Sequence, residues 1–272
     1  MQPLAELKPV VDEAIAPERP IIQVSGLDHV YPSRDGPVHA LSDIALTVGE
    51  GRFVVIVGPS GCGKSSLLMM LAGLRHQTAG TILCSGRPIT DPDPDRVGVV
   101  FQEANLFPWL TAIDNVAFPL ALRGVSRAER AARANAMLEL VGLGDAGGRY
   151  PHELSGGMKQ RVSIARGLVQ DPPVLLMDEP FAALDEQTRM AMGEELLRIW
   201  SATRKTVVFV THSLTEAVYL ADEVLVMSAR PGRIVDRMEV ELPRPRTYEM
   251  MAGAVFGRLR DRIWQQIKAP AR

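Results

Sequence analysis

A glycine-rich loop that ends in a lysine and a serine is the first candidate for chemistry in this chain. It fits the pattern G-x-x-x-x-G-K-[ST], with Gly58, Pro59, Ser60, Gly61, Cys62, Gly63, Lys64 and Ser65. Glycines let backbone N–H groups face an anion, and the N-terminus of a following helix adds its dipole. Lys64 can reach the β- and γ-phosphates, Ser65 can ligate Mg²⁺, and Ser66 extends the set. The loop predicts binding of a nucleoside triphosphate with Mg²⁺, and the alternative is an ordinary glycine-rich turn.

Two carboxylates follow a strongly apolar segment, residues 174–177, later in the chain. Asp178 stands at the tip of that predicted strand and suits a contact with Mg²⁺. Glu179 is one residue further, so it projects differently and can orient a water on the γ-phosphate. Alone, the pair reads equally as a junction of strand and loop with solvated acids. Beside the phosphate loop, it predicts hydrolysis of the triphosphate.

A second possible anion site begins at Ser155, in the segment LSGGM of residues 154–158. Ser155 is a plausible helix N-cap, and Gly156 and Gly157 expose backbone N–H groups. Taken alone, the segment is better explained by a simple capped helix start.

The elements that must position these residues alternate along the chain. Apolar runs predict strands at residues 21–25, 44–48, 53–57, 97–101, 174–177 and 206–210. Helical periodicity falls between them at residues 64–74, 127–141, 156–169 and 187–204. This alternation predicts a mostly parallel α/β sheet, with a helical lobe over residues 103–171, where no good strand is found. A last helix is indicated by a four-residue apolar repeat at Met251, Val255, Leu259, Ile263 and Ile267.

Composition excludes several classes of protein. Of 272 residues, 46% are hydrophobic and 23% charged, with a net charge of −2, so the chain is globular and has no basic surplus for nucleic acid. Cys62 and Cys84 are too few for a disulfide framework or a four-thiolate zinc site. Residues 1–20 read as a tail and not as a signal peptide. The longest apolar stretch, residues 106–122, is interrupted by proline and aspartate, so we expect any membrane span to belong to another chain.

Together the motifs resemble those of the ATP-binding subunit of ABC transporters. LSGGM is similar to the family's LSGGQ signature, with Met158 in place of glutamine. Asp178 and Glu179 resemble the Walker B aspartate and the catalytic glutamate. Four further residues resemble, in order, the aromatic that stacks on adenine, the Q-loop glutamine, the D-loop aspartate and the switch histidine: Tyr31, Gln102, Asp185 and His212.

The resemblance implies a P-loop NTPase fold of the ABC ATPase type, α/β, with a mostly parallel core sheet, an antiparallel β subdomain and an inserted helical subdomain. It divides the chain into a tail (1–20), an ATPase domain (21–245, helical subdomain about 103–171) and a C-terminal amphipathic helix (246–272). ATP and Mg²⁺ are the implied cofactors, with the metal near Ser65, Gln102 and Asp178. Glu179 and His212 are the implied catalytic residues.

The family further implies a homodimer in which Ser155 and Gly157 of one subunit cap ATP held by Lys64 of the other. It also implies integral-membrane permease subunits, a solute-binding protein acting indirectly, no nucleic acid, and a peripheral position on the cytoplasmic face of the inner membrane. Segments 228–235 and 242–246 resemble the nitrate, sulfonate and taurine importers. An exporter subunit or a non-transport ABC ATPase is the alternative. A GTPase is disfavoured because the chain lacks an N-K-x-D motif.

Overall fold

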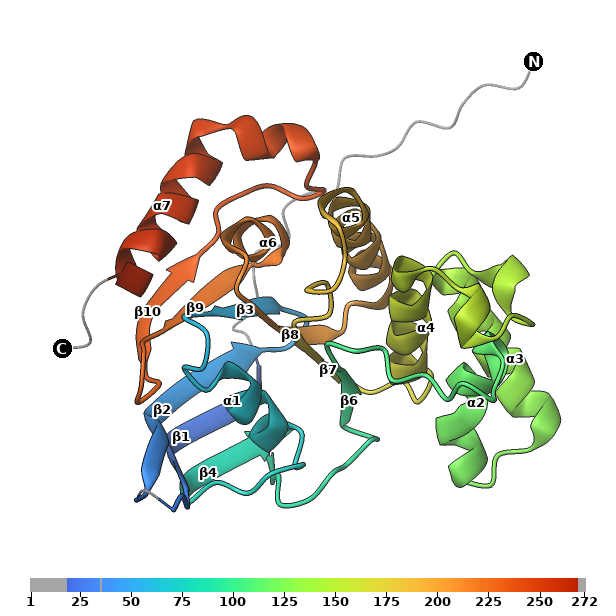
Figure 1. The fold of residues 1–272 in the computed structure, drawn as a ribbon, viewed down its shortest axis with the longest axis horizontal. Coiled ribbons are helices and arrows are strands. Elements are labelled where there is room, and N and C mark those ends of the chain that lie inside the picture. Colours follow the sequence, from blue (N-terminus) through green and yellow to red (C-terminus); the bar gives the residue numbers. More distant parts are fainter. Residues whose placement is uncertain (1–18, 35, 269–272) are drawn as a thin grey trace.

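Two β-sheets organise the computed structural model, which describes residues 19–34 and 36–268 (Figure 1). The larger sheet has six strands in the order β10-β9-β3-β8-β7-β6. All its neighbouring strands pair in parallel except β10, which is antiparallel to β9. The prediction of a mostly parallel core sheet is confirmed. Its strands are β3 (Phe53–Val57), β6 (Val97–Val100), β7 (Val174–Asp178), β8 (Thr206–Thr211), β9 (Glu223–Met227) and β10 (Ile234–Glu239).

The smaller sheet is antiparallel throughout, with the order β2-β1-β4-β5. Its strands are β1 (Pro20–Tyr31), β2 (Val38–Gly49), β4 (Ala79–Cys84) and β5 (Arg87–Pro88). The antiparallel subdomain is therefore present, but β1 and β2 are much longer than the apolar runs at 21–25 and 44–48. Irregular register along the pair lets them continue past those runs. Residues 1–18 of the expected tail lie outside the described residues.

The predicted helices are all present, with two larger differences in their ends, whereas the helices at Ala112–Leu122 and Leu214–Leu220 were not predicted individually. The helix expected over 64–74 ends at Leu71, because Gly73 has a left-handed φ of +70° and the Leu74 N–H turns back to donate to the Met69 carbonyl at 2.9 Å. The last helix begins at Ala254, and Met251 lies in a preceding 3₁₀ turn. The helices are α1 (Lys64–Leu71), α2 (Ala112–Leu122), α3 (Arg127–Leu140), α4 (Gly156–Leu168), α5 (Glu186–Thr203), α6 (Leu214–Leu220) and α7 (Ala254–Lys268).

Both faces of the core sheet are covered, as the continuous apolar run of β3 predicts. Successive side chains point to opposite faces, so Val54 and Ile56 pack with α1 and the antiparallel sheet. Phe53, Val55 and Val57 belong to the other cluster, which includes residues of α4, α5, α6 and α7. Figure 1 shows α1 between the two sheets, with α5 and α6 across the core sheet from it. The loop after β3 therefore leaves a rigid, fully buried strand.

Residues 103–171 form helices without any strand, and they project from the β6 side of the core (Figure 1). α2, α3 and α4 pack on one another here, and two 3₁₀ turns, Gly144–Ala146 and Pro151–Glu153, lie between α3 and α4. Buried Asn115 ties the preceding loop down, since its side chain accepts from the Phe107 N–H at 2.8 Å and donates to the Phe107 carbonyl at 3.2 Å. Within residues 19–34 and 36–268, no helix has the length and apolar character needed to cross a bilayer.

Candidate functional site

The phosphate loop joins β3 to α1, the strand–loop–helix context that its motif requires. Gly63 is the N-cap of α1 at φ +102°, and a Cβ there would lie 2.6 Å from Leu41 Cδ2. Gly61 also has a left-handed backbone, at φ +72°. Only glycine adopts such angles without strain, so the sequence folds here into a loop whose N–H groups and helix N-terminus can receive an anion.

Lys64 is held inside this loop by the loop's own backbone. Its side chain is buried, and its Nζ donates to the carbonyls of Gly58 at 2.9 Å and Pro59 at 3.1 Å. Both partners are neutral, so the ammonium charge is positioned without being neutralised by a carboxylate at either bond. The loop thus presents a fixed cation where the motif predicts the phosphates.

Ser65 and Asp178 meet across the core, although 113 residues separate them in sequence. Ser65 Oγ donates to Asp178 Oδ1 at 2.9 Å, and Asp178 is 8% exposed at the end of β7. Burial raises the pKa of the Asp178 carboxyl, and the Ser65 hydrogen bond partly opposes that rise. A hydroxyl and a carboxylate are the hard oxygen donors that Mg²⁺ prefers.

This donor set fits a metal shared with a substrate and not an all-protein cage. Among residues 19–34 and 36–268, no group of three or more His, Cys, Asp or Glu side chains is arranged to hold a metal. Mg²⁺ commonly binds through one or two protein oxygens together with phosphates and water. Gln102, the third residue expected near the metal, lies exposed just after β6.

Glu179 and His212 form a direct contact at the ends of β7 and β8. Glu179 Oε2 lies 2.8 Å from His212 Nδ1. The Glu179 backbone has a left-handed φ of +44° and donates its N–H to the Val210 carbonyl at 2.9 Å. This unusual conformation turns the Glu179 side chain away from the direction taken by Asp178. The two adjacent carboxylates therefore reach different partners, Ser65 for one and His212 for the other.

Tyr31 lies at the phosphate loop, because β1 continues six residues beyond the run that predicted it. Its hydroxyl is 2.8 Å from Ser66 Oγ, and the Arg75 guanidinium carbon lies 4.9 Å from its ring centroid. A pocket opens above the loop, and the residues lining it are Tyr31, Val38, Ala40, Gly61, Gly63, Lys64, Ser65, Ser66 and Arg230. Sequence reasoning missed Val38, Ala40 and Arg230; for Arg230 a signal existed, since it lies in the importer-like segment 228–235.

The structure does not bring the second anion site into this pocket. Ser155 Oγ accepts from the Met158 N–H at 3.3 Å and caps α4, with Gly156 and Gly157 opening the helix. Asp185 likewise caps α5, accepting from the Thr188 N–H at 3.0 Å. None of these residues lines the pocket above the phosphate loop. The LSGGM segment and the phosphate loop therefore lie apart from each other within one chain.

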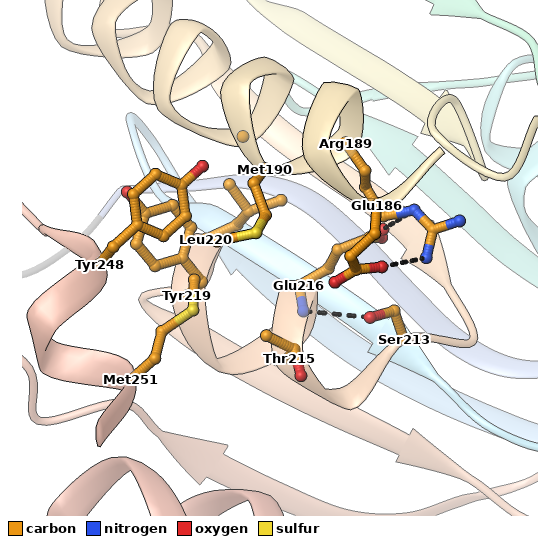
Figure 2. A pocket seen from close by; sticks show the side chains of 11 residues that line it. Glu186, Arg189, Met190, Ser213, Thr215, Glu216, Tyr219, Leu220, Tyr248 and Met251 are labelled. Carbon is orange, nitrogen blue, oxygen red and sulfur yellow. Dashed lines mark hydrogen bonds and ion pairs between the residues drawn. The ribbon is translucent and has the colours of Figure 1, made fainter. Parts of the chain in front are cut away.

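A smaller hollow lies between α5, α6 and the 3₁₀ turn Tyr248–Ala252, with Ser213 in its lining, and Figure 2 shows its side chains. Arg189 Nη2 donates to the Leu184 carbonyl at 3.0 Å, and its Nε lies 3.6 Å from Glu216 Oε1. Glu216 Oε2 in turn accepts from Thr211 Oγ1 at 2.6 Å. Burial raises the pKa of Glu216. The contacts brace the loop before Asp185 against the strand end before His212.

Comparison with known proteins identifies similar sequences. The family model described as "ABC transporter" matches residues 41–182. A taurine import ATP-binding protein, TauB, of Rhizobium johnstonii is 52% identical over 76% of this chain and 79% of its own length. A nitrate import ATP-binding protein, NrtD, of Synechocystis sp. is 45% identical over 89% of this chain and 93% of its own.

Solved structures agree with the sequence comparisons. The dimeric ATP-binding cassette MJ0796, in a post-hydrolysis state bound to ADP and Pi, aligns with a TM-score of 0.72 and 32% identity, covering 82% of this chain and all of that one. CbiO1 of Clostridium perfringens, part of a transporter complex, aligns with a TM-score of 0.75 and 28% identity, covering 92% of this chain and 98% of that one.

Proposed function

This chain belongs to the ABC transporter family, and from that premise we propose that it binds and hydrolyses ATP to energise uptake of a small solute through a separate permease. The observation that supports it most is one constellation at the ends of β3, β7 and β8. It joins a buried cation, a hydroxyl–carboxylate pair and a carboxylate–histidine pair. The named relatives are import ATP-binding proteins for taurine and nitrate, so an exporter or a non-transport ATPase is not favoured.

In this proposal each side chain has one task. Lys64 and the loop of residues 58–66, through the backbone N–H groups of its residues other than Pro59, bind the β- and γ-phosphates. Ser65 and Asp178, with Gln102 as a further oxygen ligand, would hold Mg²⁺, which when bound neutralises charge on the phosphate oxygens. Tyr31 stacks on adenine, and its bond to Ser66 fixes the ring above the loop.

Glu179 is proposed as the general base that orients and deprotonates the attacking water. Its partner His212 is 54% exposed in its side chain and reaches toward the γ-phosphate. The contact between them at 2.8 Å aligns both groups before substrate arrives. Asp178, held by Ser65, cannot serve as the base while it faces the metal.

We propose that the working unit is a homodimer with composite sites. Ser155, Gly156 and Gly157 of one subunit would cap the ATP held by Lys64 of the other, with Asp185 at the subunit contact. Two observations support this: the signature residues do not line the pocket of their own chain, and the MJ0796 cassette is dimeric. Closure of the dimer would exclude water and strengthen the electrostatic interactions around the phosphates.

The permease is proposed to dock on the helical region. A groove between that region and the core is lined by Leu74, Phe107, Phe118 and Leu122 among others, and beside it Trp109 is 71% exposed. Exposed apolar surface of this kind is typical of a protein interface. We therefore propose that the chain is a peripheral subunit on the cytoplasmic face of the inner membrane, with a solute-binding protein acting through the permease. We propose that nucleic acid is not among the partners of this chain.

For the chain as a whole we propose the tail 1–20, the ATPase domain 21–245 with its helical subdomain at about 103–171, and the segment 246–272 ending in α7. Residues 269–272 lie outside the described part of the chain. Figure 1 supports the division, because the helical region projects from the core and α7 packs over its opposite side.

ATP titration tests the proposal. Lys64→Ala removes the buried cation, so ATP affinity should fall well below that of the wild type and ATPase activity should be lost. Lys268→Ala, at the exposed end of α7, is the matched control and should change neither. An unchanged ATP affinity in Lys64→Ala would contradict the assignment of the loop.

A further inference from the structure

The turn between β9 and β10 is the part of the importer-like segment 228–235 to which the proposed function gives no role. It closes on itself through Ser228, whose N–H donates to the Arg233 carbonyl at 2.9 Å. Ser228 Oγ donates to the Pro231 carbonyl and accepts from the Arg233 N–H, both at 3.0 Å. These hydrogen bonds lie within the turn, so they fix its shape independently of its contacts with other elements.

The same turn is packed directly on the phosphate loop. The Gly232 N–H donates to the Ala40 carbonyl at 2.9 Å, and the Ser42 N–H donates to the Gly232 carbonyl at 3.0 Å. A Cβ on Gly232 would lie 2.1 Å from the Cys62 carbonyl oxygen. Only glycine permits so close an approach, so the turn is held at one position beside the loop.

Arg230 reaches from this turn into the pocket above the phosphate loop. Its Nε donates to the Gly61 carbonyl at 3.1 Å, and its Nη2 lies 3.0 Å from where a Cβ on Gly61 would stand. Among residues 19–34 and 36–268, Nη1 and Nη2 of Arg230 have no hydrogen-bond or ion-pair partner, because the bond to Gly61 is made by Nε. Arg230 and Lys64 are the charged residues among those lining the pocket, and both are cations.

We propose that Arg230 is a further nucleotide-binding residue whose guanidinium binds phosphate oxygens beside Lys64. The inference rests on the proposed function, because it concerns the same pocket. Arginine offers five donors in a planar fork, and docking on Gly61 uses the Nε alone. The remaining donors face a pocket whose lining includes no carboxylate. A second cation there adds to the attraction for a polyanion that the loop N–H groups and Lys64 already exert.

The test compares binding of ADP and of inorganic tripolyphosphate, measured by calorimetry, in the wild type and three variants. Arg230→Gln keeps a polar side chain but removes the charge, so both ligands should bind about tenfold more weakly, the low end for hydrogen bonds to charged groups. The salt dependence of binding should become shallower. Arg230→Lys should restore part of the affinity. Arg233→Gln is the matched control, since Arg233 lies in the same turn but bonds to Ser42 Oγ at 2.9 Å.

Several results would overturn the inference. Wild-type affinity in Arg230→Gln would exclude a contact with phosphate. A loss for ADP without a loss for tripolyphosphate would place Arg230 at the ribose or base. A loss of affinity for both ligands with unchanged salt dependence would show that Arg230 only supports the loop through its bond to the Gly61 carbonyl. A wild-type protein that binds neither ligand would instead contradict the proposed function itself.

Discussion

Replacing Glu179 with glutamine separates the chemistry of this site from its binding of nucleotide. Glutamine keeps the size of the side chain and can keep a hydrogen bond to His212 Nδ1, now at 2.8 Å from Glu179 Oε2. It removes the negative charge and the basicity. Loss of a positioned general base lowers the rate by about 10²–10⁴.

The structure shows why a loss of activity of that size would identify Glu179 as the general base and not only as a residue that positions His212. His212 is 54% and Glu179 21% exposed in the side chain, and a polar contact with such exposure, even if charged, contributes about 1 kcal/mol at most. One kilocalorie per mole is about a fivefold change in rate. If Glu179 only positioned His212, Glu179→Gln would therefore retain at least a tenth of wild-type activity.

The assay measures phosphate release, ATP affinity and oligomeric state together. Affinity should stay the same or tighten, because a negative charge near the γ-phosphate is gone. The ATP-bound dimer should accumulate, and size-exclusion chromatography with ATP should show the variant as a dimer while the wild type stays mostly monomeric. Hydrolysis at the wild-type rate would refute the role of Glu179. Loss of ATP binding would move Glu179 to the Mg²⁺ shell and refute the division of tasks with Asp178.

Tyr31→Ala should weaken ATP binding by about 1–3 kcal/mol if the ring stacks on adenine, while Tyr31→Trp should retain most of the affinity in the same titration. Mixing Lys64→Ala with Ser155→Arg subunits should restore part of the ATPase activity, since one composite site in the heterodimer is intact; no recovery would argue against sites shared between subunits. Asp178→Asn should raise the melting temperature of the nucleotide-free protein at pH 7. Burial raises the pKa of the Asp178 carboxyl, so wild-type stability falls as pH rises from the unfolded to the folded pKa, and the variant should lack that fall.

The sequence by itself determined the elements whose causes are local. The phosphate loop needs glycine at Gly63, where φ is positive, and the apolar run at residues 53–57 became β3 with the predicted bounds. Ser155 caps α4, as its residue type predicts. Each of these features depends on a few neighbouring residues, so the sequence pattern predicts it without knowledge of the tertiary structure.

Weak local signals explain what the sequence missed. β4, β5, β9 and β10 were not predicted. β4 and β9 pair with β1 and β3, which are distant in sequence, whereas β5 and β10 each pair with the strand just before them, and β5 has only two residues. α2 was missed because Pro119 lies inside it and Asn115 is buried in it, serving the preceding loop. α6 has seven residues, too few for a clear helical period.

Only the tertiary structure decided which distant residues share the site. Tyr31 meets Ser66 across 35 residues, Ser65 meets Asp178 across 113, and Arg230 meets Gly61 across 169. These pairings follow from the order of strands in the sheets, which sets which strand ends and turns are neighbours. The same order leaves Ser155 outside the pocket of its own chain. Side-chain types and spacing specify the chemistry available, whereas the packing of strands fixes the distances over which that chemistry acts.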